Sequence, residues 1–107
     1  MTPAPALVSL LDRIEAAVGA DRALDAAIER TLRGPAQDPP DYTASVDHCL
    51  ELLHALLPYW HWHIGRGARG IMPYASLSKG RVTVSADGTT VPQVLLAAIV
   101  MALQKEA

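Results

Sequence analysis

Residues 59–81 hold the side chains best suited to binding a charged or aromatic ligand. Four of the chain's five aromatic residues lie in this segment: Tyr59, Trp60, Trp62 and Tyr74. Four basic residues are interleaved with them: Arg66, Arg69, Lys79 and Arg81. Aromatic faces beside cations suit nucleobases and phosphates. The segment therefore predicts, as one alternative, a nucleic-acid or nucleotide site.

His61 and His63 have the spacing that places two imidazoles on one face of a strand. Two metal ligands can use that spacing, but a zinc site needs three or four converging donors. Cys49 belongs to an apolar stripe, and His48 and His54 diverge around a helix. We therefore expect no metal and no other cofactor, and we interpret His61 and His63 as half-exposed strand residues.

Two other pairs have side-chain types that can act in catalysis. Cys49 and His48 are adjacent on a predicted helix, so their side chains point about 100° apart. Asp47 and Glu51 share one helix face, where like charges are usually solvated. The sequence therefore predicts a protein that is not an enzyme. The candidate binding residues are Tyr59, His61, His63, Arg66, Arg69, Tyr74, Lys79 and Arg81.

A structural interpretation of residues 59–81 competes with the nucleic-acid alternative. Aromatic residues on strands usually pack in a core, and the arginines would then lie on turns. The Gly-rich segment 65–70 lacks the spacing of phosphate-binding loops. The last helix begins TVPQ, without the lysines of the double-stranded RNA-binding domain that the αβββα order resembles. Binding to protein is therefore favoured over binding to nucleic acid.

The hydrophobic pattern predicts the elements that position these residues. Apolar residues at helical spacing predict helices at 7–18 and 21–32 and a third helix that Thr43 or Ser45 caps and Pro58 ends. A last helix starts at Thr90. Alternation of apolar and polar residues predicts strands at 59–65, 72–78 and 81–86. We expect an α+β fold with a three-stranded antiparallel sheet covered by helices, in the order α-α-linker-α-β-β-β-α. The layering would be αβα sandwich-like, with the N-terminal helices on the second sheet face or on the last helix.

The length of 107 residues fits one domain. Within it we expect an N-terminal helical arm at 1–33, a Pro-rich linker at 34–41 and a compact αβββα core at 42–107. The apolar content of 50% is high for so small a sheet, which favours a homodimer. The net charge of −2 argues against a general nucleic-acid binder, although residues 65–107 are locally basic.

The composition also bears on the cell compartment. A single cysteine and an N-terminus without a basic region before its apolar run predict a reducing, cytoplasmic setting. The longest apolar run, 94–103, is too short to span a membrane, for which about 20 residues are needed. We expect no membrane association.

Several segments together resemble a family of small bacterial and prophage proteins. They are DRALDAAI at 21–28, YTASVDHCLELL at 42–53, a Trp-bearing strand with Trp60 and Trp62, and TVPQVLLAAIVMAL at 90–103, which begins with Thr-x-Pro. These features resemble proteins of the phage ABA-sandwich domain type. The resemblance implies a compact αβα arrangement, a phage or prophage origin and a host-cell cytoplasmic location, but no reaction. It favours an accessory protein that binds a host or phage protein.

Overall fold

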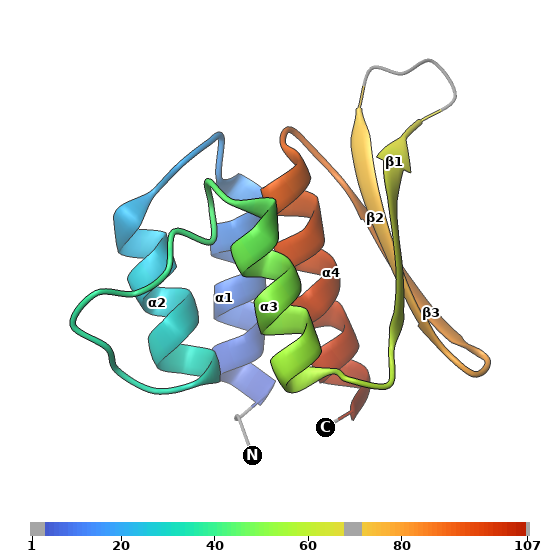
Figure 1. The fold of residues 1–107 in the computed structure, drawn as a ribbon, viewed down its shortest axis with the longest axis horizontal. Coiled ribbons are helices and arrows are strands. Elements are labelled where there is room, and N and C mark those ends of the chain that lie inside the picture. Colours follow the sequence, from blue (N-terminus) through green and yellow to red (C-terminus); the bar gives the residue numbers. More distant parts are fainter. Residues whose placement is uncertain (1–3, 68–71, 107) are drawn as a thin grey trace.

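The computed structural model describes residues 4–67 and 72–106. Four helices and three strands follow the expected order: α1 Ala4–Ala16, α2 Arg22–Leu32, α3 Val46–Leu56, β1 His61–Arg66, β2 Pro73–Lys79, β3 Val82–Asp87 and α4 Val91–Glu106. The strands form one antiparallel sheet in the order β1-β2-β3. The expected α+β class and element order are confirmed (Figure 1).

Side-chain caps set three of the helix starts. Asp21 accepts a 3.0 Å hydrogen bond from the Leu24 N–H at the start of α2. Ser45, one of the two expected caps of α3, accepts from the His48 N–H at 3.2 Å. Thr90 accepts from the Gln93 N–H at 3.2 Å at the start of α4. Each oxygen satisfies one of the N–H groups that a helix start leaves without a partner.

Helix α4 is the centre of the hydrophobic core. It is buried continuously from Gln93 to Val100. Helix α1, helix α3 and strands β2 and β3 pack around it. A helix that is apolar on most of its circumference needs cover on several sides, so this packing explains its sequence. The N-terminal helix lies on the last helix, which was one of the two expected places.

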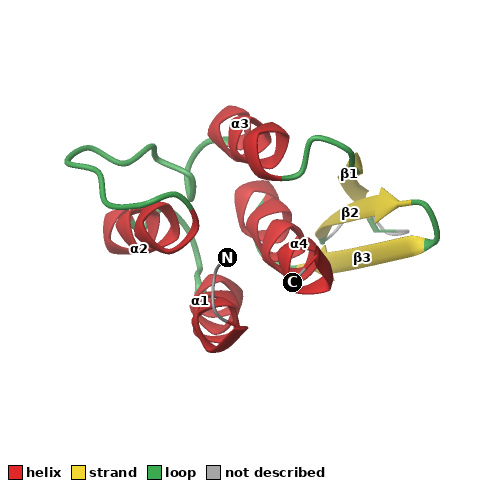
Figure 2. Ribbon diagram, turned by 90° about the horizontal axis from the view of Figure 1, so that it is seen from below, coloured by secondary structure: helices red, strands yellow, loops and turns green. Residues whose placement is uncertain are grey.

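All four helices lie on one side of the sheet (Figure 2). Of the two expected placements of the N-terminal helices, the one on the last helix is therefore found, and the second sheet face is left without a helix. The composition of the outer sheet face gives the reason. Its positions, set by the register, are mainly polar: His61, His63, Tyr74, Ser76, Ser78, Thr83, Ser85 and Asp87. Burying such a surface under a helix would leave many polar groups without partners.

The Pro-rich segment is a loop held against α2. The Arg22 guanidinium donates to the Pro39 carbonyl at 2.9 Å, and the buried Tyr42 hydroxyl donates to Glu29 at 2.7 Å. Helix α2 ends before Gly34, whose φ of 121° is a conformation that glycine adopts without strain.

Among the described residues, no helix combines the length and apolar character that a membrane span requires.

Candidate functional site

The hydrogen-bond pattern of the sheet shows which backbone groups face its open edges. The Gly67 N–H donates to the Met72 carbonyl at 2.9 Å, and the Gly88 N–H donates to the Pro73 carbonyl at 3.2 Å. Along antiparallel strands, residue pairs that hydrogen-bond to each other alternate with pairs whose N–H and C=O groups point away from each other. The two bonds show which pairs are bonded, and the register then gives the direction of the N–H and C=O groups of the other strand residues.

Both outer strands point backbone donors and acceptors away from the sheet. On β1 the residues concerned include Trp62 and Ile64, and on β3 they are Thr83, Ser85 and Asp87. A row of such groups at a sheet edge is a template for pairing with another strand. Both edges also carry apolar side chains that are partly exposed, because Trp62 is 44% exposed and Val82 41% exposed. The edges are therefore suited to binding another polypeptide.

The outer face gathers three of the candidate binding residues predicted from sequence. His61 and His63 lie on β1, and Tyr74 lies on β2. The His63 Nε2 and the Tyr74 hydroxyl are 2.8 Å apart, and their ring centroids are 5.6 Å apart. A Cβ added to Gly65 would lie 3.0 Å from Tyr74 Cε1, so the ring covers this glycine closely. Gly65 thus leaves the space that lets Tyr74 reach His63.

The remaining candidate residues do not join this cluster. Arg66 ends β1 and pairs in register with Pro73, whereas Lys79 ends β2 and Arg81 follows it. Six residues of strand separate the two ends by roughly 20 Å. Tyr59 precedes β1 and is 78% exposed. Arg69 lies outside the described residues. Neighbours in sequence are therefore spread along a hairpin instead of forming one basic patch.

Lys79 is held by an acidic residue of α4. Its ammonium donates to Glu106 Oε1 at 2.9 Å, and the Trp60 indole N–H donates to the same oxygen at 2.7 Å. These two hydrogen bonds, with Lys79 the stronger contributor, lower the pKa of the Glu106 carboxyl. Trp60 is buried, as the structural interpretation of the aromatic residues predicts. Trp62 is partly exposed because α4 packs against β2 and β3, leaving the β1 edge less covered.

The cysteine and its neighbours form no activated nucleophile. Cys49 is fully buried, and its thiol donates to the Tyr42 carbonyl at 3.1 Å. Burial is the main reason that its pKa rises to about 12. A nucleophilic cysteine needs the opposite shift. The neighbouring His48 ring bonds to the Asp41 carboxylate instead. Cys49 is therefore a small core residue.

The described residues contain no group of three or more His, Cys, Asp or Glu side chains placed to hold a metal ion. On the sheet, His61 and His63 are the two side chains that could serve as a pair of metal ligands. The outer-face register places them in rows with serines and a threonine: His61 with Ser78 and Thr83, and His63 with Ser76 and Ser85. Hydroxyl side chains are poor substitutes for the further imidazole, thiolate or carboxylate ligands of zinc.

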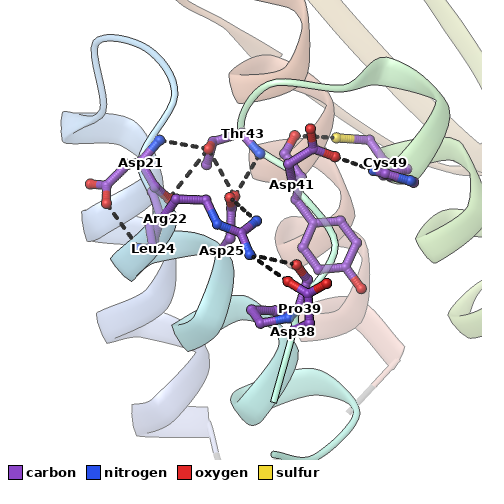
Figure 3. Close-up of polar contacts among 11 residues, drawn as sticks. Asp21, Arg22, Leu24, Asp25, Asp38, Pro39, Asp41, Thr43 and Cys49 are labelled. Carbon is purple, nitrogen blue, oxygen red and sulfur yellow. Dashed lines mark hydrogen bonds and ion pairs between the residues drawn. The ribbon is translucent and has the colours of Figure 1, made fainter. Parts of the chain in front are cut away.

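A buried polar network around Asp25 was not predicted from the sequence (Figure 3). Asp25 is 1% exposed and accepts hydrogen bonds of 2.8 Å from both the N–H and the hydroxyl of Thr43. Arg22 pairs with Asp25 at 3.1 Å and reaches Asp38 at 3.3 Å. These bonds attach the Pro-rich loop to α2. The network explains the conformation of the loop and leaves no buried side-chain polar atom unbonded among the described residues.

A hollow lies between the helices and the end of the sheet at which β2 begins and β3 ends, beside the β3 edge. It has a volume of about 610 Å³, and its lining includes Glu15 of α1, Met101 of α4, and Ala86 and Asp87 of β3. A smaller hollow of about 200 Å³ shares Glu15 and Asp87 and extends to Ala97 of α4. The hollows therefore place an apolar stretch of α4 beside a strand edge with outward-pointing backbone groups.

Comparisons with protein-family models, with curated proteins and with solved structures found no match to this chain.

Proposed function

We propose that this chain is a non-catalytic binding protein that docks a protein partner through its open β-sheet. The carrying observation is the orientation of the edge groups: the register turns N–H and C=O groups of β1 and β3 away from the sheet. A polypeptide that pairs with such an edge gains main-chain hydrogen bonds, and the adjacent side chains give specificity. The setting we propose is that of a phage or prophage accessory protein in the cytoplasm of its host, as the family resemblance implies.

The proposed partner is a second copy of this chain or a host or phage protein. The partly exposed Trp62 and Val82 support a protein partner, because pairing at either edge would cover apolar surface. Nucleic acid is less favoured, since Lys79 already pairs with Glu106 and lies roughly 20 Å along the sheet from Arg66. A phosphate backbone is bound best by cations that act together.

The test compares the 107-residue chain with a variant whose edges are blocked. Ile64→Pro and Ser85→Pro each remove an N–H group that points away from the sheet. Proline, which has no N–H group, is tolerated at such positions of an edge strand. Light scattering after size-exclusion chromatography reports the oligomeric state, and a tagged pull-down from nuclease-treated host lysate reports other partners. Circular dichroism confirms that the double variant is folded.

We expect a dimer or a captured protein with the original chain, and its loss in the double variant. Binding that persists when both edges are blocked would contradict strand addition. If the protein is a monomer that captures no protein but binds RNA or DNA in a salt-sensitive way, the nucleic-acid alternative replaces this proposal. Loss of that binding in Lys79→Ala and Arg81→Ala would then locate the binding surface.

A further inference from the structure

We infer that the β3 edge and the hollow beside it bind an extended, basic segment of a partner protein, an inference that rests on the proposed function. Thr83, Ser85 and Asp87 supply the outward backbone donors and acceptors. An added strand pairing with them would become the fourth strand of the sheet. Its alternate side chains would then point toward the helices, because successive residues of a strand face opposite sides.

Part of the floor under this fourth strand is apolar, and the rest of the hollows' lining carries polar groups. Ala97 and Met101 of α4 line the two hollows and are four residues apart, so they share one face of the helix. On the β3 side, Ala86 lines the larger hollow. Val82 at the start of β3 is 41% exposed. Apolar side chains of the incoming segment would therefore find apolar surface.

The charge of the hollows defines the chemistry of the segment. Glu15 and Asp87 line both hollows and are the charged residues among the lining residues that the structure describes. Neither carboxylate has an ion-pair partner within residues 4–67 and 72–106. Two unpaired carboxylates beside a strand edge favour a segment that carries lysine or arginine. The complement is therefore a strand with alternating apolar residues and a basic residue at the end beside Glu15 and Asp87, because Arg81 precedes the other end of β3.

The β1 edge is less suited to the same segment. Helix α4 packs against β2 and β3, so a strand added beyond β3 stays close to the helical layer. At β1 the nearest charged side chain on the strand is the basic Arg66. Strand β1 carries no acidic residue, whereas Asp87 at the end of β3 attracts a basic segment. Charge therefore distinguishes the two edges.

The probe is a display library of random peptides of about ten residues, a length that covers one strand. Selection on the immobilised 107-residue chain should enrich sequences with Lys or Arg beside alternating apolar residues. Hydrogen exchange by NMR should show the Thr83, Ser85 and Asp87 amides exchanging fast in the free protein and slowly with the best peptide. Enrichment of acidic peptides, or protection of Trp62 and Ile64 instead, would overturn the inference.

Matched variants test the two parts of the surface separately. Ser85→Pro should weaken the best peptide by roughly tenfold or more, because it removes a main-chain donor and obstructs pairing. Ser85→Ala keeps the N–H group and should bind as the original chain does. Glu15→Gln with Asp87→Asn should weaken binding several-fold and reduce its dependence on salt.

Equal binding to Ser85→Pro and Ser85→Ala would rule out the β3 edge. If no peptide is enriched while light scattering or the pull-down still shows an edge-dependent complex, this inference fails and the proposed function stands. If neither experiment shows binding, both fail.

Discussion

The side-chain amide of Gln93 donates a 2.8 Å hydrogen bond to the backbone carbonyl of Ala17, 76 residues earlier in the chain. The same nitrogen lies 3.1 Å from the carbonyls of Ile14 and Glu15. Gln93 Oε1 accepts from the Thr89 N–H at 2.7 Å. One side chain thus caps the end of α1 and the start of α4, and it attaches the N-terminal helix to the core of its own chain.

Replacing Gln93 with alanine should lower the free energy of unfolding by about 2 kcal/mol, because buried carbonyls at the end of α1 lose their donor. Gln93→Glu should be more harmful, since a carboxylate in that place repels the same carbonyls. Urea unfolding measures both. Gln104, which is on the same helix, gives the control: Gln104→Ala should change stability by less than about 0.5 kcal/mol.

The buried Asp25 should be the most sensitive polar residue of the fold. Asp25→Ala leaves the Thr43 N–H without an acceptor and the Thr43 hydroxyl with only the Asp21 carbonyl, 3.3 Å away, so we expect a loss of about 3 kcal/mol in urea unfolding. Thr43→Val removes a hydroxyl that donates to Asp25 and accepts from the Asp21 N–H, both at 2.8 Å, and should lose about 1–2 kcal/mol. Thr43→Ser keeps the hydroxyl and is the matched control. A loss for Thr43→Ser as large as for Thr43→Val would show that the methyl group matters more than the hydrogen bond.

Local patterns in the sequence were sufficient to predict most of the elements. The stripe of leucines in α1, the Asp21 cap and the position of Pro73 at a strand start follow from interactions within a few residues. The Asp25–Thr43 bond was not predictable in this way, because it joins residues 18 apart across a Pro-rich loop. The same limit applies to Gln93, whose capping-box pattern indicates a local partner while its amide reaches α1.

The candidate site was only partly predictable for a related reason. Alternation placed Trp60 and Trp62 on one face, but only the position of α4 makes Trp60 buried and leaves Trp62 partly exposed. Proximity in sequence suggested a basic cluster, whereas the hairpin carries Arg66 and Lys79 to opposite ends. The edge groups of β3 depend on the register, which no single strand sequence specifies.

Gly65 should be required for the contact between His63 and Tyr74. Gly65→Ala places a Cβ about 3.0 Å from the Tyr74 ring, so the ring must move and its 2.8 Å bond to His63 should break. Stability should change by less than about 1 kcal/mol, because the contact involves the end of a side chain. NMR of the His63 ring measures the loss. Tyr74→Phe removes the same bond without moving the ring, and it should produce a similar change at His63.

Stability should fall at high pH because of Cys49. Its pKa of about 12 in the folded protein lies above the ordinary value of 9.0, so the unfolded chain loses the proton first as the pH rises. The stabilisation is complete below pH 9, and we expect a loss of about 3 kcal/mol by pH 11. The raised pKa of Tyr42 acts in the same direction. Urea unfolding between pH 8 and pH 11 measures the slope, and Cys49→Ala should make it shallower; an unchanged slope would assign the effect to Tyr42 alone.

The pKa of Glu106 should report on the junction between α4 and the sheet. In the folded protein it is lowered by the hydrogen bonds from Lys79 and Trp60. Because a lowered carboxyl pKa stabilises the folded state above the unfolded pKa, this contribution should be lost as the pH falls through the folded pKa. NMR titration of Lys79→Met should show the pKa of Glu106 moving up toward its ordinary value of 4.5. Lys105→Met, which removes a neighbouring charge but not the hydrogen bond, should leave it nearly unchanged. An equal rise in the pKa of Glu106 in the two variants would mean that the nearby positive charges together, and not the hydrogen bond from Lys79, lower this pKa.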